Sequence, residues 1–269
     1  MSGFSAEWLT MREPHDLRAR NPMVLDAVTA AVEGLSPLRI VDLACGTGAT
    51  MRTLGPHLPA PQSWSLIDND LGLLARAKAT PLATSATVTA VLLDLNRDLE
   101  AALDGPVDLV ATSALLDLVA EAWLDRFAVE IAVRGIPLYA ALSYDGRIGF
   151  TPSDPLDAAI TAAVNAHQRT DKGFGPALGP AATPFALARF KALGYTIVHG
   201  LSDWVMGPGD HDMQTELLAG WASAAHEIGT LSRADTNAWL ARRRKSVAAG
   251  QSSLQVGHVD FFAAPRTTR

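Results

Sequence analysis

A short glycine-containing segment directly after an apolar run constrains the fold of this chain more than any other feature. The run covers residues 38–43, and residues 44–48, with glycines at 46 and 48, separate it from a helical stretch that begins near residue 49. Glycines at such a turn let the backbone approach a ligand closely, and the next helix offers free N–H groups at its N-terminus. A strand, a glycine turn and a helix in this order predict a nucleotide-type site at the tip of a strand.

Apolar runs and helical stretches alternate through the first half of the chain. The predicted strands cover residues 38–43, 64–68, 88–93, 107–112 and 137–142, and the predicted helices between them cover 49–54, 71–79, 97–103 and 121–133. Strands that are apolar throughout and separated by helices are typical of a parallel sheet covered on both faces. Right-handed crossovers then predict a doubly wound α/β fold with its site at the carboxyl edge of the sheet.

Beyond residue 143 the pattern is less regular and indicates additions to this core. Helices are predicted over residues 154–167, 183–193 (with Thr183 as its N-cap), 210–228 and 233–249, and strands over 195–205 and 254–263. We interpret residues 1–269 as a single domain. Its predicted parts are an N-terminal helical lid (1–35), a ligand-binding core (36–143), cap insertions (144–182 and 207–250), and a last strand with a tail (251–269).

Charge and composition limit the classes of function. The chain has 269 residues, 48% of them hydrophobic, and a net charge of −6, so it can bury a sizeable core but lacks the basic balance of a broad nucleic-acid surface. Residues 242–245 are four consecutive basic residues. A solvated helix end is the ordinary interpretation of such a cluster, and a local basic groove is the alternative.

The cysteine count and the lengths of the apolar runs predict the cellular compartment of the protein. Cys45 is the single cysteine, which excludes an intrachain disulfide and a cysteine-based zinc site. The N-terminal segment lacks the apolar core of a signal peptide, and no apolar run approaches the roughly 18 residues of a membrane helix. These features predict a reducing, cytoplasmic setting without membrane contact.

Carboxylates stand at the ends of the first three predicted strands. Asp42 precedes the glycine turn, Asp68 ends the second strand, and Asp94 follows the third. A carboxylate at Asp68 can accept hydrogen bonds from both ribose hydroxyls of a nucleoside, and Asp70 is the better candidate for the N-cap of the next helix. Asp94 is placed to accept the exocyclic amine of adenine, with Leu95 covering the ring.

These residues together resemble the class I, Rossmann-like S-adenosylmethionine-dependent methyltransferases over residues 38–143. Asp42 and the glycine turn look like the first motif of that family, although Ala44 stands where the family often has glycine. The carboxylate of Asp42 would repel a pyrophosphate, whereas it suits a cationic amino-acid group. The resemblance implies a seven-stranded, mostly parallel sheet with an antiparallel last strand, which the strands at 195–205 and 254–263 would insert as a hairpin.

The resemblance also implies a cofactor and the residues that contact it. S-Adenosyl-L-methionine is the expected cofactor, and S-adenosyl-L-homocysteine is the product formed from it. A basic residue from the N-terminal helices, Arg12 or Arg20, is expected to bind the cofactor carboxylate. The remaining residues expected at the cofactor are Asp42, Ala44, Cys45, Gly46, Gly48, Asp68, Asn69, Asp94, Leu95 and Ser113.

The acceptor side of the site is predicted from the segments that follow the later strands. His167 is a candidate general base, because an imidazole titrates near neutral pH and residues 173–180 form a glycine-rich loop beside it. The candidate substrate-binding residues are Asp117, Gln168, Lys172, Trp204 and His211. His211 lies between two aspartates, but no other ligand cluster accompanies it, so no metal site is expected.

The leading interpretation is in-line methyl transfer to a small molecule whose acceptor atom (O, N, S or C) stays open. The protein would act as a monomer or homodimer without nucleic acid. An RNA or protein methyltransferase and a non-catalytic S-adenosylmethionine-binding protein are the alternatives. A dinucleotide oxidoreductase is disfavoured, because Met51 stands where the third glycine of its motif would be.

Overall fold

The structure, a computed structural model, describes residues 4–79 and 85–266. Parallel strands build the first part of its sheet: β1 (Leu38–Leu43), β2 (Gln62–Asp68), β3 (Ala86–Leu92), β4 (Leu109–Ser113) and β5 (Leu138–Thr151). Antiparallel pairing adds β6 (Tyr195–Leu201), β7 (Trp204–Met206) and β8 (Ser253–Pro265). The strand order is β3-β2-β1-β4-β5-β8-β6, and β7 pairs with β8. The predicted doubly wound α/β fold, with an antiparallel strand inserted by a hairpin, is confirmed.

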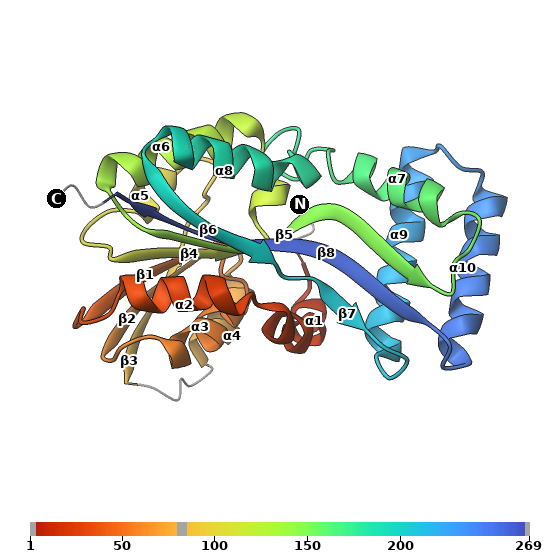
Figure 1. The fold of residues 1–269 in the computed structure, drawn as a ribbon, viewed down its shortest axis with the longest axis horizontal. Helices are drawn as coiled ribbons and strands as arrows, with labels where there is room; N and C mark the ends of the chain where they lie inside the picture. Colours follow the sequence, from red (N-terminus) through yellow and green to blue (C-terminus); the bar gives the residue numbers. More distant parts are fainter. Residues whose placement is uncertain (1–3, 80–84, 267–269) are drawn as a thin grey trace.

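Helices cover both faces of the parallel sheet (Figure 1). One face carries α1 (Ala6–Ala19), α2 (Pro22–Ala31), α3 (Ala49–Leu54) and α4 (Leu71–Ala79), and the other carries α5 (Leu99–Ala102), α6 (Glu121–Arg134) and α8 (Ala182–Ala192). Each face buries its own apolar cluster, with Met51, Trp64 and Tyr139 in one and Phe127 and Phe190 in the other. Burial of both faces explains why the central strands are apolar throughout.

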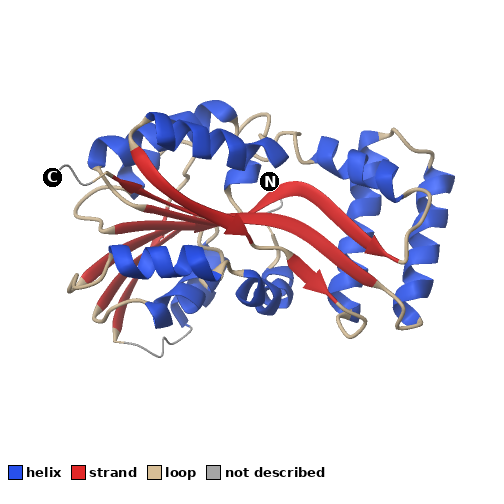
Figure 2. Cartoon of the chain, viewed as in Figure 1, coloured by secondary structure: helices blue, strands red, loops and turns tan. Residues whose placement is uncertain are grey.

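A third helical layer packs where β5 and β8 continue beyond the main sheet, as Figure 2 shows. It consists of α7 (Asp157–His167), α9 (His211–Ile228) and α10 (Arg233–Ala248). Their apolar side chains form a separate cluster that includes Trp221 and Trp239. Arg243 on α10 is buried and donates a hydrogen bond to Asp157 at the start of α7. The interpretation of these segments as a cap over a substrate site stays a prediction.

The sheet has eight described strands because the predicted strand over residues 195–205 is divided in two. The interruption lies between Leu201 and Trp204. Asp203 lies in it, and its carboxylate accepts hydrogen bonds from the side chains of Arg147 and Gln255 and from the backbone N–H of His258 on β8. The register against β8 continues across the interruption, from Leu201 opposite Val259 to Trp204 opposite Val256.

Two sequence-based boundaries were wrong. The fifth strand, predicted over residues 137–142, continues to Thr151 through a bulge at Leu142, whose φ is 52°. The predicted N-cap at Thr183 lies instead inside α8, because a 3-10 turn (Gly179–Ala181) leads directly into that helix. The hydroxyl of Thr183 is buried and has no hydrogen-bond partner among the described residues.

Candidate cofactor and acceptor site

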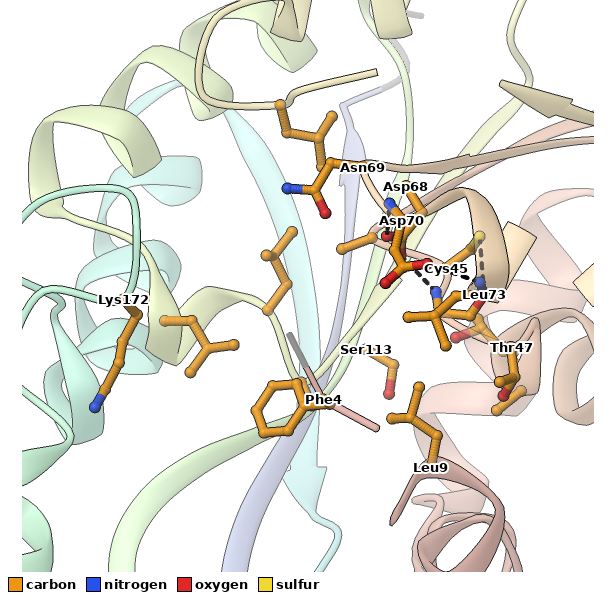
Figure 3. A pocket seen from close by; sticks show the side chains of 18 of the residues that line it. Phe4, Leu9, Cys45, Thr47, Asp68, Asn69, Asp70, Leu73, Ser113 and Lys172 are labelled. Carbon is orange, nitrogen blue, oxygen red and sulfur yellow. Dashed lines mark hydrogen bonds between the residues drawn. The ribbon is translucent and has the colours of Figure 1, made fainter. Parts of the chain in front are cut away.

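A cavity of about 660 Å³ opens at the carboxyl edge of the sheet (Figure 3). Its walls come from the ends of β1, β2 and β4, the turn after β3, helix α1 and the loop after α7. The lining residues are Phe4, Leu9, Arg12, Asp16, Ala44, Cys45, Gly46, Thr47, Ala49, Thr50, Asp68, Asn69, Asp70, Leu73, Leu93, Asp94, Leu95, Ser113, Ala114, Leu115, Leu118, Lys172 and Phe174. The position is the one expected for a ligand of an open α/β sheet.

The glycine turn adopts a left-handed backbone at alternate residues. Ala44, Gly46 and Gly48 have φ values of 52°, 54° and 81°. A Cβ at Gly46 would lie 3.1 Å from Cδ1 of Leu9 on α1, so both the backbone conformation and the close approach of that helix require glycine there. Gly48 does not line the cavity, because it faces Ala77 of α4.

Asp68 connects β2 to the glycine turn. Its Oδ2 accepts the backbone N–H of Gly46 at 2.8 Å, and its Oδ1 accepts the N–H of Asp70 at 3.0 Å. Burial raises the pKa of Asp68, and these backbone donors oppose that shift. Asp70 accepts the backbone N–H groups of Gly72 and Leu73 at 2.7 and 3.0 Å, which confirms its capping role. Each oxygen of Asp68 retains a lone pair for a ligand hydroxyl.

The adenine-side candidates lie at the turn after β3. Asp94 and Leu95 both line the cavity, next to Asn69 in the turn after β2. The Oδ1 atom of Asp94 accepts the N–H of Asn96 at 2.9 Å, and the carbonyl of Leu95 accepts Nε1–H of Trp123 at 2.8 Å. These bonds fix the turn, so a polar acceptor and an apolar side chain are presented together.

Asp42 lies on β1 behind the cavity wall. It is fully buried, and neither carboxylate oxygen has a hydrogen-bond partner among the described residues. Burial raises the pKa of Asp42 to about 8, and the positive charges of Arg20 and Arg52 oppose the shift while Asp68 adds to it. Such a group needs a donor or a cation from outside the described chain.

Arg20 is a second buried group with unused hydrogen-bonding capacity. It follows α1, and its Nη2 donates to Oγ of Ser113 at 3.2 Å, at the tip of β4. Its guanidinium lies 5.9 Å from the centre of the Tyr139 ring. The Nε and Nη1 atoms are buried and have no partner in the described part of the chain. Asp260 on β8 accepts the N–H of Asn21 at 3.0 Å and thereby anchors the backbone next to Arg20.

Helix α1 is clamped over the glycine turn. Arg52 of α3 donates to both carboxylate oxygens of Glu13 at 2.5 and 2.6 Å, and to the carbonyl of Thr47 at 2.5 Å. The next turn of α1 is held from the other side, since Asp16 accepts Nε1–H of Trp204 at 3.0 Å. Asp16 also accepts Nε–H of Arg12 at 2.9 Å.

Among the predicted acceptor residues, Lys172 lines the cavity. Its ammonium donates to the hydroxyl of Thr170 at 3.0 Å and lies 3.3 Å from Nδ1 of His167. The other ring nitrogen of His167 lies 3.0 Å from a carboxylate oxygen of Glu227. His167 itself does not line the cavity, and Gln168 beside it is the C-cap of α7.

The other predicted acceptor residues lie around the cavity rather than in its lining. Asp117 is buried behind the wall segment that includes Leu115 and Leu118, and burial raises its pKa to about 6. Trp204 packs against α1. His211 lines a separate pocket of about 290 Å³ near the start of α9.

Several lining residues were missed in the sequence. Leu9 and Asp16 are three residues before and four residues after Arg12, so helical spacing places all of them on one face of α1 and was a usable signal. Phe174 lies in the glycine-rich loop and packs edge-on against Trp123 at 5.3 Å. An aromatic residue inside a glycine-rich loop has no periodic pattern that could have identified it.

Comparisons with known proteins rest on structure. No protein-family model matches the chain, and no curated protein is similar to it in sequence. A cyclopropane-fatty-acyl-phospholipid synthase-like protein from Lactobacillus casei superimposes with a TM-score of 0.53 and 15% identity, covering 97% of this chain and 94% of that one. An S-adenosylmethionine-dependent methyltransferase from Geobacter sulfurreducens, solved with S-adenosyl-L-homocysteine, superimposes with a TM-score of 0.50 at 17% identity. This match covers 99% of this chain and 100% of that one.

A cyclopropane synthase from Mycobacterium tuberculosis also superimposes with a TM-score of 0.50 at 14% identity, covering 97% of this chain and 94% of that one. At these identities the likeness concerns the fold. Within the described residues, no helix is long and apolar enough to cross a membrane. The strand order and the structural likeness together show that this chain has the fold of the class I S-adenosylmethionine-dependent methyltransferases.

Proposed function

We propose that this protein transfers the methyl group of S-adenosylmethionine to a small-molecule acceptor by in-line displacement. One observation carries the proposal: the glycine turn, Asp68, Asp94 and Ser113 meet around a single cavity at the carboxyl edge of the sheet. Solved neighbours with this fold include a methyltransferase in complex with S-adenosyl-L-homocysteine, which supports the choice of cofactor.

Two buried polar groups directly behind the cavity lining have charges that match the amino-acid part of this cofactor. Arg20 has two unpaired guanidinium nitrogens beside Ser113, which suits a carboxylate. Asp42 has two unpaired oxygens, which suits an ammonium group. Asp68 would accept the ribose hydroxyls, and Asp94 with Leu95 would hold the adenine. Of the two arginines that the sequence offers for the carboxylate, we choose Arg20 over Arg12 because its unpaired nitrogens are buried and because it lies in the field of Asp42, the proposed partner of the ammonium group.

The proposed reaction requires little acid–base catalysis by the protein. When bound, the cofactor supplies a methyl group that its sulfonium already activates, so alignment and exclusion of water are the main tasks of the chain. Helix α1 and the loop that carries Lys172 and Phe174 enclose the cavity. His167 reaches this cavity through Lys172. We therefore assign His167 a positioning role rather than direct proton transfer.

An acceptor of nucleic-acid size finds less support. Of the basic residues at 242–245, Arg242 pairs with Asp154, and Arg243 pairs with Asp157. These ion pairs join α10 to the segment at the start of α7. Two of the four positive charges are therefore neutralised by carboxylates of this protein. A small acceptor within the enclosed cavity is the function that the geometry supports best.

Calorimetric titration with S-adenosyl-L-homocysteine tests the proposal. Wild-type protein should bind it, and Asp68→Ala should lose at least tenfold in affinity, about 1.4 kcal/mol, because hydrogen bonds to a charged acceptor disappear. Asp98→Ala is the matched control, since Asp98 is exposed, lies outside the cavity and makes no side-chain cap bond. Absence of binding to the wild type, or equal affinity of both variants, contradicts the proposal.

A further inference from the structure

The charged residues of the cavity are unevenly distributed. Asp68, Asp70 and Asp94 gather where the adenosine is proposed to bind. Arg12 and Lys172, contributed by α1 and by the loop after α7, also line it, as does Asp16, which pairs with Arg12. In Figure 3 Lys172 and the Phe4 ring lie across the cavity from Asp68 and Asp70. The part of the cavity away from the adenosine therefore has a basic component.

Arg12 is held in place with part of its guanidinium unused. It is 8% exposed, its Nε donates to Asp16, and its guanidinium lies 5.3 Å from the centre of the Trp204 ring. Asp16 is in turn occupied by Trp204 through its other oxygen. Within residues 4–79 and 85–266, neither Nη atom of Arg12 has a hydrogen-bond partner. A fixed fork with two free donors is suited to a planar oxyanion.

If Arg20 holds the cofactor carboxylate, as proposed above, the guanidinium of Arg12 remains available to a second ligand. Arg20 lies beside Ser113 and in the field of Asp42, and it is not part of the cavity lining. Arg12 lines the cavity and lies within electrostatic range of Asp117, on the segment after β4. Arg12 is thus the arginine that a second ligand in the cavity can contact directly.

Two titratable groups lie behind Arg12, His258 and Asp117. His258 lies within electrostatic range of Arg12, and burial lowers the pKa of that imidazole to about 3, so it is neutral at physiological pH. Two carboxyl groups oppose the charge of Arg12: Asp16, which pairs with its Nε and lines the cavity, and Asp117, which is buried and absent from the lining. The remaining acceptor-side surface is apolar, with Phe4, Leu118 and Phe174.

We infer that Arg12 binds a carboxylate of the methyl acceptor, and that the acceptor is a small organic acid with an apolar or aromatic body. The inference rests on the proposed function and adds the class of the second substrate. Arg12 is thus an acceptor-binding residue, Asp16 is a positioning residue that orients its guanidinium, and Arg20 serves the cofactor.

Matched acid and amide probes test this assignment. Acetate and acetamide, benzoate and benzamide, and phenylacetate and phenylacetamide are titrated into protein saturated with S-adenosyl-L-homocysteine. At least one acid should bind ten times more tightly than its amide. Arg12→Gln should remove that preference, and its affinity for S-adenosyl-L-homocysteine should stay within twofold of wild type. Arg12→Lys keeps the charge but loses the fork, and it should retain only part of the preference.

Controls separate the possible results. Arg18→Gln removes an exposed arginine from the same helix and should change neither affinity. The assignment is overturned if no acid is preferred over its amide, if Arg12→Gln preserves the preference, or if Lys172→Met alone abolishes it. It is also overturned if folded Arg12→Gln loses tenfold or more in affinity for S-adenosyl-L-homocysteine, since Arg12 would then serve the cofactor. Failure of wild-type protein to bind S-adenosyl-L-homocysteine contradicts the proposed function instead.

Discussion

At the scale of single residues, the buried pair of an acidic group, Asp42, and a basic group, Arg20, shows which ligand groups would complete the site. Asp42 and Arg20 influence each other electrostatically, yet neither donates to or accepts from the other. Both are left with unpaired polar atoms, which is costly in a protein interior. A zwitterionic ligand that offers a carboxylate to one and an ammonium to the other would satisfy both, which is the physical basis for proposing an amino-acid-bearing cofactor.

Asp42 should make cofactor binding depend on pH. Its pKa of about 8 in the ligand-free fold means that the carboxyl is mostly protonated at pH 6. A cationic ligand group favours the ionised form, so binding should release a proton, and affinity for S-adenosyl-L-homocysteine should rise between pH 6 and 8, by up to about tenfold per pH unit. Calorimetry in buffers of different ionisation enthalpy measures both effects. Arg20, Arg52 and Asp68 are the charged groups that act on Asp42, and Asp42→Asn should remove the slope.

The same shift has a consequence for stability. The folded-state pKa of Asp42 lies above its ordinary value of 3.8, so the folded protein holds a proton that the unfolded chain has lost between about pH 4 and 8. The contribution of Asp42 to stability is therefore greatest below this range and declines as pH rises through it. Urea unfolding of ligand-free protein should show a flatter pH profile for Asp42→Asn. An unchanged profile would contradict the assigned burial.

At the scale of elements, the glycine turn combines two kinds of constraint. Gly46 needs its positive φ and has Leu9 directly above it, whereas Ala44 adopts φ 52° with a side chain present. An L-residue in this conformation costs roughly 1–2 kcal/mol, and glycine avoids that cost but loses more chain entropy on folding.

Ala44→Gly should therefore stabilise the fold or leave it unchanged, by about 0 to 1 kcal/mol, in contrast to the usual cost of introducing glycine. Thermal and urea unfolding measure the effect. Ala49→Gly in the first turn of α3 is the comparison, and it should destabilise by up to about 1 kcal/mol. A loss of more than 1 kcal/mol for Ala44→Gly would mean that the turn does not carry this strain.

The bond between Glu13 and Arg52 should control how long the cofactor stays bound. Both side chains are partly buried, and they join α1 to the helix after the glycine turn. Glu13→Gln should raise the dissociation rate of S-adenosyl-L-homocysteine about five- to tenfold, roughly 1–1.4 kcal/mol, by loosening α1. Stopped-flow displacement measures the rate. Glu7→Gln, whose ion pair on the same helix is mostly exposed, should leave it unchanged.

The sequence predicts elements whose pattern is local and misses features that arise from tertiary contacts. The apolar strands β1 and β2 and the helix α4 follow from periodicity and from the cap at Asp70. The bonds of Asp203, between β6 and β7, to Arg147 and to β8 join residues more than 50 positions apart, which no local pattern encodes.

The same distinction holds for the site. The carboxylates at strand ends could be located in the sequence because parallel strands place their carboxyl ends at one edge. The candidates beyond β5, such as His167 and His211, depend on how a loop and the third helical layer fold back. In the structure His167 lies outside the cavity lining and contacts Lys172, which does line the cavity. His211 lines a separate pocket.

At the scale of the whole molecule, the chain combines a binding sheet with a helical layer on the extended halves of β5 and β8. Arg243 is 2% exposed and is bonded to Asp157, so it is the charged anchor of that layer. Arg243→Met leaves Asp157 without this partner and should cost about 3–5 kcal/mol in the free energy of unfolding, measured in urea. Arg242→Met breaks a pair with Asp154 in which the arginine is half exposed, and it should cost about 1 kcal/mol or less. Equal effects would contradict the anchoring role of Arg243.

The central claim is that one cavity, bounded by the tips of neighbouring strands, holds an S-adenosyl nucleoside. A crystal structure of the protein with S-adenosyl-L-homocysteine tests it most directly. The account predicts ribose hydroxyls within hydrogen-bond distance of Asp68, adenine against Leu95, and the ligand carboxylate at Arg20. A ligand bound away from Asp68 and Asp94 would contradict it. So would a ligand bound in the opposite orientation, with its adenine near Arg20 and its carboxylate near Asp94.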